Sequence, residues 1–189
     1  MAKKEFVFLY PIPEIINFEI KNHGWHKKGG EEAFRKEYNK LLNGCINERY
    51  RQKGFRINWV IFDDCSISDV INLQPTDQVI KAGIDFKIHT TEEVYPDQDY
   101  ILSQLNGEII RIAGFHMWDC VEKLAMRAYE IGLDTLVDED LTEFFSWRID
   151  DYDFKIDKYP TFNPKKQGPM FFENFIQARK RRPWLWQNY

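Results

Sequence analysis

The chain has 189 residues, of which 43% are hydrophobic and 30% charged, with a formal net charge of −4 at pH 7. These values are typical of one soluble globular domain, and the acidic balance gives no general attraction to nucleic acid. No apolar run approaches the roughly 18 residues of a membrane helix, and the N-terminus lacks the cleavage site of a signal peptide. Three cysteines without paired spacing exclude a disulfide framework, so we predict a cytoplasmic protein with no membrane association.

The first half of the sequence predicts three strands and a long helix, in the order strand 4–10, helix 31–53, strand 56–62 and strand 78–81. The apolar run KEFVFLY predicts the first strand, and Pro11 and Pro13 predict a loop after it. Apolar side chains at helical spacing predict the helix, which Gly54 should end. Residues 63–77 are expected to form a loop, and residues 82–97 carry no clear pattern.

The second half continues with a helix at 97–105, a strand at 108–113, a turn at 114–119, a helix at 120–131 and a strand at 134–137. Asp97 is a suitable N-cap for the first of these helices, and Gly132 closes the second. Alternating strands and helices with short loops predict parallel strands and right-handed crossovers. We therefore predict a three-layer α/β/α sandwich around a doubly wound parallel sheet of five or six strands.

The C-terminal part of the chain is rich in aromatic residues, so it should pack on its own domain or on a second subunit. We divide the chain into an α/β domain at 1–162 and an aromatic, basic extension at 163–189. A strand at 153–156 and a helix at 169–178 are possible within these segments. The basic run at 179–182 is more typical of a helix end than of a nucleic-acid site, so nucleic-acid binding is a minor hypothesis.

Cys120 is the strongest candidate for chemistry. It follows the turn at 114–119, at the carboxyl end of a predicted parallel strand, where ligands bind in doubly wound sheets. The first turn of the next helix should stabilise a thiolate and lower the pKa of Cys120, although Asp119 opposes this effect. The plain alternative is a buried cysteine that acts as a small hydrophobic residue.

The segment GFHMWDCVEKLAMRAYEIGLDTLVDED at 114–140 resembles the nucleophile segment of isochorismatase-like cysteine hydrolases, which include nicotinamidases and N-carbamoylsarcosine amidohydrolases. The shared features are a strand that ends in glycine, a cysteine six residues later, valine next, two small residues, a closing glycine and an aspartate: Gly114, Cys120, Val121, Ala125, Ala128, Gly132 and Asp140. The family's usual Thr-Asp pair before the cysteine is replaced by Met117 and Trp118. The resemblance implies an isochorismatase-like fold, a Cys120 nucleophile and a homo-oligomer.

The resemblance also implies a lysine and an aspartate beside the cysteine. Lys81 best matches the lysine, with Lys87 as the fallback, but no aspartate stands at the end of the first strand, where the chain has Tyr10 and Pro11. The family aspartate takes the thiol proton, so another base is needed. We name Glu14 and His116 as candidates, and His89 as a further one.

Metal and cofactor binding are not predicted. His23 and His26 stand three residues apart, but Gly24 favours a loop there and no Cys or Asp cluster is near. The Asp-x-His metal motif of nicotinamidases has no counterpart at 63–65, which disfavours a metal-dependent nicotinamidase.

The sequence thus leads to two hypotheses about function. The first is a hydrolase that acts on a C–N bond of a small amide or related carbonyl compound. In it, Lys81 would stabilise the charge that develops during the reaction, and backbone amides of 117–120 would form the oxyanion site. The second is a catalytically silent relative that binds a small ligand or a partner protein through the same pocket. Under either hypothesis the pocket residues are Tyr10, Phe115, Met117, Trp118 and Asp119.

Overall fold

The protein folds around a five-stranded sheet, seen in a computed structural model that describes residues 2–151, 153–159 and 176–187. The strands are β1 (Lys4–Leu9), β2 (Arg56–Ile61), β3 (Gln78–Lys81), β4 (Ile109–Gly114) and β5 (Asp134–Thr142). All neighbouring strands are parallel, and their order is β3-β2-β1-β4-β5. The predicted doubly wound sheet is therefore confirmed, with five strands.

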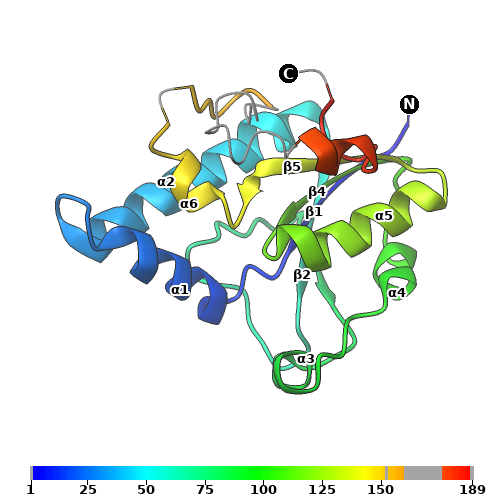
Figure 1. Ribbon diagram of the computed structural model, residues 1–189, viewed down its shortest axis with the longest axis horizontal. Coiled ribbons are helices and arrows are strands. Elements are labelled where there is room, and N and C mark those ends of the chain that lie inside the picture. Colours follow the sequence, from blue (N-terminus) through cyan, green and yellow to red (C-terminus); the bar gives the residue numbers. More distant parts are fainter. Residues whose placement is uncertain (1, 152, 160–175, 188–189) are drawn as a thin grey trace.

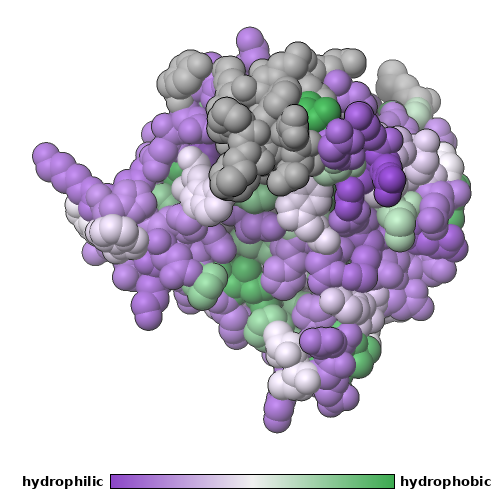
Figure 2. Space-filling view, viewed as in Figure 1, coloured by the Kyte–Doolittle hydropathy of each residue, from purple (hydrophilic) through white to green (hydrophobic). Residues whose placement is uncertain are grey.

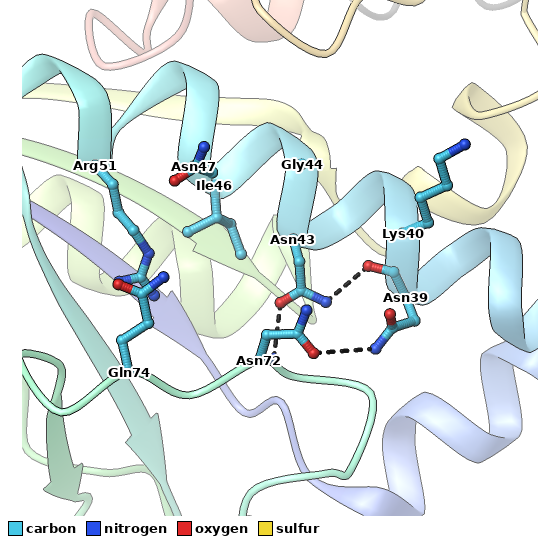
Figure 3. Close-up of a pocket in the computed structure, with 9 residues that line it drawn as sticks. All are labelled: Asn39, Lys40, Asn43, Gly44, Ile46, Asn47, Arg51, Asn72 and Gln74. Atoms are coloured by element: carbon cyan, nitrogen blue, oxygen red, sulfur yellow. Dashed lines mark hydrogen bonds between the residues drawn. The ribbon is translucent and has the colours of Figure 1, made fainter.

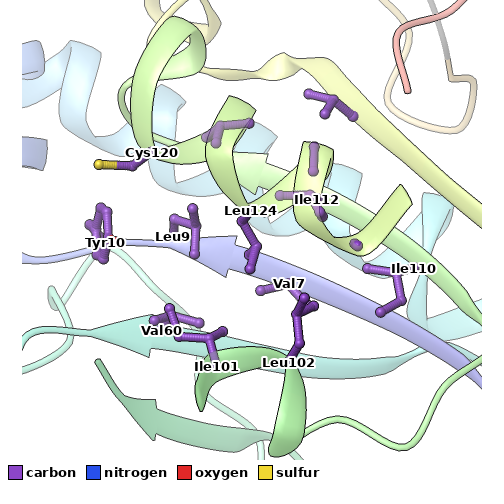
Figure 4. Packing of buried hydrophobic residues seen from close by; sticks show 14 of the residues in the cluster. Val7, Leu9, Tyr10, Val60, Ile101, Leu102, Ile110, Ile112, Cys120 and Leu124 are labelled. Atoms are coloured by element: carbon purple, nitrogen blue, oxygen red, sulfur yellow. The ribbon is translucent and has the colours of Figure 1, made fainter. Parts of the chain in front are cut away.

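Helices cover both faces of the sheet (Figure 1). They are α1 (Pro13–Gly24), α2 (Gly30–Arg49), α3 (Phe86–Glu92), α4 (Gln98–Ser103), α5 (Glu122–Glu130) and α6 (Phe145–Arg148), with a 3₁₀ turn η1 (Arg51–Lys53) and a π-helical turn η2 (Met117–Val121). The side chains of β1 alternate between the faces, as a strand requires. Phe6 and Phe8 pack with α1, α2 and α6, whereas Val7 and Leu9 pack with α4 and α5 (Figure 4).

The sequence missed three helices, α1, α3 and the short α6, and misjudged the length of one strand. Helix α1 replaces the loop expected after β1, because Pro13 occupies the first helical position, where a missing N–H costs nothing. Helix α3 lies in the unassigned stretch, and its Asp85 N-cap has no side-chain capping bond. Strand β5 runs five residues beyond the predicted end at 137. No strand forms at 153–156 among the described residues.

The described end of the C-terminal segment packs on the domain. Trp184 and Leu185 are buried in the core with α4 and α5, and the Val137 N–H donates to the Trp184 carbonyl. Arg179 forms a buried ion pair with Glu139 of β5. Residues 176–180 are helical, and the rest of the helix predicted at 169–178 lies outside the described residues. The division of the chain at residue 162 stays a prediction.

No helix in the described part of the chain combines the length and apolar character needed to cross a membrane. The face in Figure 2 is mostly hydrophilic. It is interrupted near its middle by a hydrophobic area, where Figure 1 has the connection from β1 to α1.

Candidate functional site

Strand order reverses between β1 and β4, so the carboxyl ends of these two strands form the switch point where doubly wound sheets bind ligands. Tyr10 follows β1, and the turn with His116 and Cys120 follows β4. Gly114 ends β4 with φ of 118°, and a Cβ there would lie 2.3 Å from the Leu9 carbonyl oxygen. Only glycine allows β4 to approach β1 this closely, which explains the glycine six residues before Cys120.

Four side chains gather at this switch point, and we call them the thiol cluster: Tyr10, His89, His116 and Cys120. The Cys120 Sγ lies 3.9 Å from the His89 Nε2 and 3.8 Å from the His116 Nδ1. Its third neighbour is the Tyr10 hydroxyl, which forms a hydrogen bond with Cys120. Figure 4 shows the sulfur above the Tyr10 ring. The sequence therefore predicted three of the four members, and His89 only as a further base.

Two residues of the cluster have left-handed backbone conformations that side chains rarely adopt. The φ angles are 61° at Tyr10 and 63° at His116. Such strain costs of the order of 1–3 kcal/mol and gathers at functional sites. Both strained positions contact the same sulfur atom, so the fold maintains this arrangement against a local cost.

The environment of Cys120 keeps its thiol protonated. Burial raises the pKa of Cys120 to about 12, and the Asp119 carboxylate adds to the rise. Cys120 is 3% exposed and is the fourth residue of the π-helical turn η2. The prediction that the helix N-terminus lowers this pKa is therefore wrong, because loss of solvation outweighs the helix dipole.

Two imidazole nitrogens face the Cys120 sulfur, one from each side of the switch point. The Val94 carbonyl lies 2.8 Å from the His89 Nδ1, so that nitrogen carries the proton and the Nε2 lone pair faces the sulfur. Protein atoms around part of the His116 ring displace water and lower its pKa, although the residue as a whole is exposed, and the nearby His89 lowers the pKa further. His89 is buried and stacks on Phe62, whereas His116 is exposed. Two basic nitrogens thus flank the thiol, one of them reachable from solvent.

The position expected to hold the family aspartate is filled by Tyr10. Burial raises the pKa of Tyr10 well above its usual value, and the proximity of Cys120 adds to the rise. The phenol therefore stays protonated and can donate a hydrogen bond, but it cannot act as the base at neutral pH. It stacks on Phe62 at 4.3 Å between ring centroids, which fixes its orientation.

Lys81 and Glu14 lie around a different cysteine. The Lys81 ammonium donates to the carbonyls of Phe62, Asp63 and Cys65, in the loop after β2. Glu14 is exposed in the first turn of α1, and its charge, like that of Lys81, acts on the Cys65 thiol. The structure thus brings His116 to Cys120, and places these two predicted catalytic residues beside Cys65.

The expected oxyanion amide already has a partner. The Met117 N–H donates to both carboxylate oxygens of Glu143, at 2.7 and 3.0 Å. Burial raises the pKa of Glu143, while the Met117 amide acts in the opposite direction. Sequence reasoning missed Glu143 because the family resemblance ends at residue 140.

The other predicted pocket residues are divided between the two faces. Phe115 is buried on the face of α1 and α2, where it contacts Phe8 edge-on at 6.0 Å. Met117 is buried with Cys120 on the opposite face, and Trp118 is 39% exposed. Asp119 pairs with Lys123, whose ammonium lies 3.8 Å from the centroid of the Tyr95 ring. Phe115 therefore supports the sheet, and the remaining three belong to η2 itself.

A cavity of about 400 Å³ lies elsewhere, between α2 and the loop at 72–74 (Figure 3). Its amide side chains are engaged within the protein. Asn39 and Asn43 both donate to the Val70 carbonyl, and Asn43 also accepts from the Asn72 N–H. These bonds hold the loop against α2, so the amides serve the scaffold.

No protein-family model and no curated protein matches the sequence. Three solved structures are similar in chain path. An isochorismatase family protein has a TM-score of 0.47 and 14% identity, over 96% of this chain and 95% of its own. A Leishmania major protein, named as a candidate MAR1 ribonuclease, has a TM-score of 0.46 and 13% identity, over 75% of this chain and 65% of its own. A hypothetical protein from Trypanosoma cruzi has a TM-score of 0.42 and 10% identity, over 75% of this chain and 67% of its own.

Proposed function

We propose that the protein is a cysteine-dependent hydrolase that acts on a C–N bond of a small amide or related carbonyl compound, with Cys120 as nucleophile. The observation that carries the proposal is the pair of imidazole nitrogens 3.8 and 3.9 Å from a thiol at the switch point of the sheet. A thiol with a high pKa can attack when a base removes its proton during the attack. Such a site needs no preformed thiolate.

The reaction balances with the groups present. His116 or His89 takes the Cys120 proton as sulfur bonds to the carbonyl carbon, and the imidazolium returns a proton to the departing nitrogen. Water then releases the acyl group from sulfur with the same base. The Tyr10 phenol is a suitable donor to the developing oxyanion, because its pKa keeps it protonated. Lys81 contributes, as the sequence predicts, only if its ammonium leaves the carbonyls that it contacts.

The test is acylation by an activated small ester, followed by peptide mass spectrometry of all three cysteines. We expect acyl mass on Cys120, and a rate that falls by about 10²–10⁴-fold when the base is removed. His116→Gly removes the imidazole and accepts the left-handed backbone. Cys65→Ser is the matched control and should leave the rate unchanged. Acylation of Cys65 alone, or a full rate in both His116→Gly and His89→Gln, would contradict the proposal.

A second candidate, a non-catalytic protein that binds a small ligand at the same place, has its own support. The Met117 amide is occupied by Glu143, and Cys120 is 3% exposed. Under this hypothesis small amides and carboxylic acids raise the melting temperature without being consumed. Iodoacetamide should then label Cys120 no faster than Cys45 or Cys65 between pH 5 and 9. Faster labelling of Cys120 with product formation would exclude this candidate.

A further inference from the structure

The thiol cluster also has the composition of a metal centre. The His89 Nε2, the His116 Nδ1 and the Cys120 Sγ all lie within 4.8 Å of one another. They come from α3 and from the turn after β4, two segments that the sheet brings together. Two imidazoles and a thiol are the donor types that bind zinc, whereas hard cations such as Mg²⁺ prefer oxygen.

The two sulfur–nitrogen distances in this set are close to those of a tetrahedral zinc site. Zinc binds sulfur at roughly 2.3 Å and imidazole nitrogen at roughly 2.0–2.1 Å, so neighbouring sulfur and nitrogen ligands lie about 3.6 Å apart. The Cys120 Sγ lies 3.8 Å from the His116 Nδ1 and 3.9 Å from the His89 Nε2. The two sulfur–nitrogen distances therefore need to shorten by only a few tenths of an ångström. The two nitrogen atoms, which lie within 4.8 Å of each other, must approach to about 3.4 Å.

His89 is oriented as a metal ligand is. Its Nδ1–H donates to the Val94 carbonyl at 2.8 Å, which fixes the tautomer and leaves the Nε2 lone pair directed at the sulfur. A backbone carbonyl behind the ring is the usual outer partner of a zinc-bound histidine. Phe62 stacks on the same ring at 5.1 Å between centroids, and Tyr95 meets it edge-on at 5.3 Å. The ring is therefore held in its ligating orientation before any metal arrives.

We propose that His89, His116 and Cys120 bind one Zn²⁺ ion, with the fourth position taken by water or the neighbouring Tyr10 hydroxyl. On binding, the Cys120 thiol gives its proton to solvent and a zinc–sulfur bond forms. His116 is exposed and provides the route of entry. This site departs from the expectation of no metal, and it does not depend on the proposed hydrolase. Zinc would occupy the nucleophile and both candidate bases, so it would reversibly stop that chemistry.

The chain contains a natural control. Two of its four histidines, His23 and His26, stand away from this cluster and were the metal candidate weighed from the sequence. His23 accepts a hydrogen bond from the Trp147 Nε1 at 2.9 Å and lies 3.5 Å from Glu19. A metal held there would bind without any contribution from Cys120. The two sites therefore predict opposite responses to the same variants.

The experiment is a Zn²⁺ titration of the reduced, metal-free protein in competition with a chromophoric chelator, repeated with Co²⁺ for its absorption spectrum. We expect one equivalent of Zn²⁺ and a thiolate-to-cobalt charge-transfer band. His116→Gly and His89→Gln should each weaken binding by at least about tenfold, and Cys120→Ser should abolish the band. His26→Ala and Cys65→Ser are matched controls and should change neither. His116 is exposed and glycine tolerates its backbone angle, so that variant should fold.

The outcomes separate this inference from the proposed hydrolase. No bound equivalent, unchanged affinity in His116→Gly, or loss of binding in His26→Ala would each overturn the zinc site. None of these results concerns acylation of Cys120 by an ester, which is measured on chelator-treated protein. Acylation that stops with one equivalent of Zn²⁺ and returns with chelator would support both. Binding without acylation would support the zinc site alone.

Discussion

Two buried polar clusters lie on opposite faces of the sheet, and they differ in how their groups are paired. The first is the thiol cluster. The second, which we call the arginine cluster, lies beside β5: Arg49, Tyr50, Asp138, Asp140 and Arg148. The Arg49 guanidinium contacts Asp138 at 3.1 Å and Asp140 at 3.0 Å, and the Tyr50 hydroxyl donates to Asp138 at 2.6 Å. Buried ions need partners at such distances, because desolvation costs several kcal/mol per ion.

In the thiol cluster, a protonated thiol is instead surrounded by the Tyr10 hydroxyl and two imidazole nitrogens. Its contacts of 3.8 and 3.9 Å leave lone pairs that a proton, a substrate or a metal ion can use. It also contains two of the three non-glycine residues with positive φ in the described chain, Tyr10 and His116. The buried ions of the arginine cluster have short contacts with opposite charges, which is typical of a structural role. The thiol cluster has long contacts and a strained backbone, which is typical of a functional site.

The largest effect should come from breaking the arginine cluster. Arg49→Met leaves two buried carboxylates without their shared cation, so we expect a loss of about 3–5 kcal/mol in the free energy of unfolding. Urea denaturation measures it. Arg127→Met is the matched control, since Arg127 forms an exposed pair with Asp99 and should cost under about 1 kcal/mol. Equal losses in the two variants would contradict the structural role of the cluster.

Glu19, a partly buried carboxylate with no Lys or Arg ion pair in the described part of the chain, should behave differently, since its neighbour His23 at 3.5 Å has a lowered pKa. Burial raises the pKa of Glu19 to about 7, Ser146 opposes this by donating a hydrogen bond, and Glu143 adds to the rise. Because the folded-state pKa is raised, the stability contribution is fully present below the unfolded value near 4.5 and is lost as pH rises through about 7. Glu19→Gln should therefore stabilise the protein by about 2 kcal/mol at pH 8 and by under about 1 kcal/mol at pH 5.

Urea denaturation at both pH values measures this difference. Glu32→Gln is the control, because Glu32 is exposed and pairs with Lys36 one turn along the helix. A Glu19→Gln effect that is larger at pH 5 than at pH 8 would mean that Glu19 has a favourable charge partner in the folded protein.

The thiol itself should matter little for stability. Cys120→Ala removes a buried sulfur whose contacts with nitrogen are long, so we expect a loss of about 1 kcal/mol, from apolar burial alone. Cys45→Ala is the matched control, since Cys45 is fully buried on the other face. Thermal unfolding of both variants gives the comparison. A cost for Cys120→Ala several times that of Cys45→Ala would place Cys120 in the scaffold and weaken both proposals for the cluster.

The sequence predicted the scaffold better than the site, for physical reasons. Strand periodicity and the spacing from Gly114 to Cys120 are local, and they predicted the sheet, the switch point and the position of the cysteine. His89 lies in a stretch without periodicity, and only folding brings it to Cys120, 31 residues later. Glu143 follows the end of the recognisable motif. Helix α1 was missed because Pro13 reads as a loop residue unless it is placed at the first helical position.

Lys81 gives the smallest expected change and the sharpest distinction between scaffold and site. Its ammonium donates to three carbonyls of the loop after β2, between 2.9 and 3.3 Å. If Lys81 only supports that loop, Lys81→Met should lower the free energy of unfolding by under about 1 kcal/mol, because the hydrogen bonds are largely exposed. The acylation rate of Cys120 should then change less than twofold. Lys87→Met, the fallback position, should change neither quantity. A loss of rate of about 100-fold or more in Lys81→Met at unchanged stability would instead show that the ammonium leaves its carbonyls to act on the substrate, as the family resemblance implies.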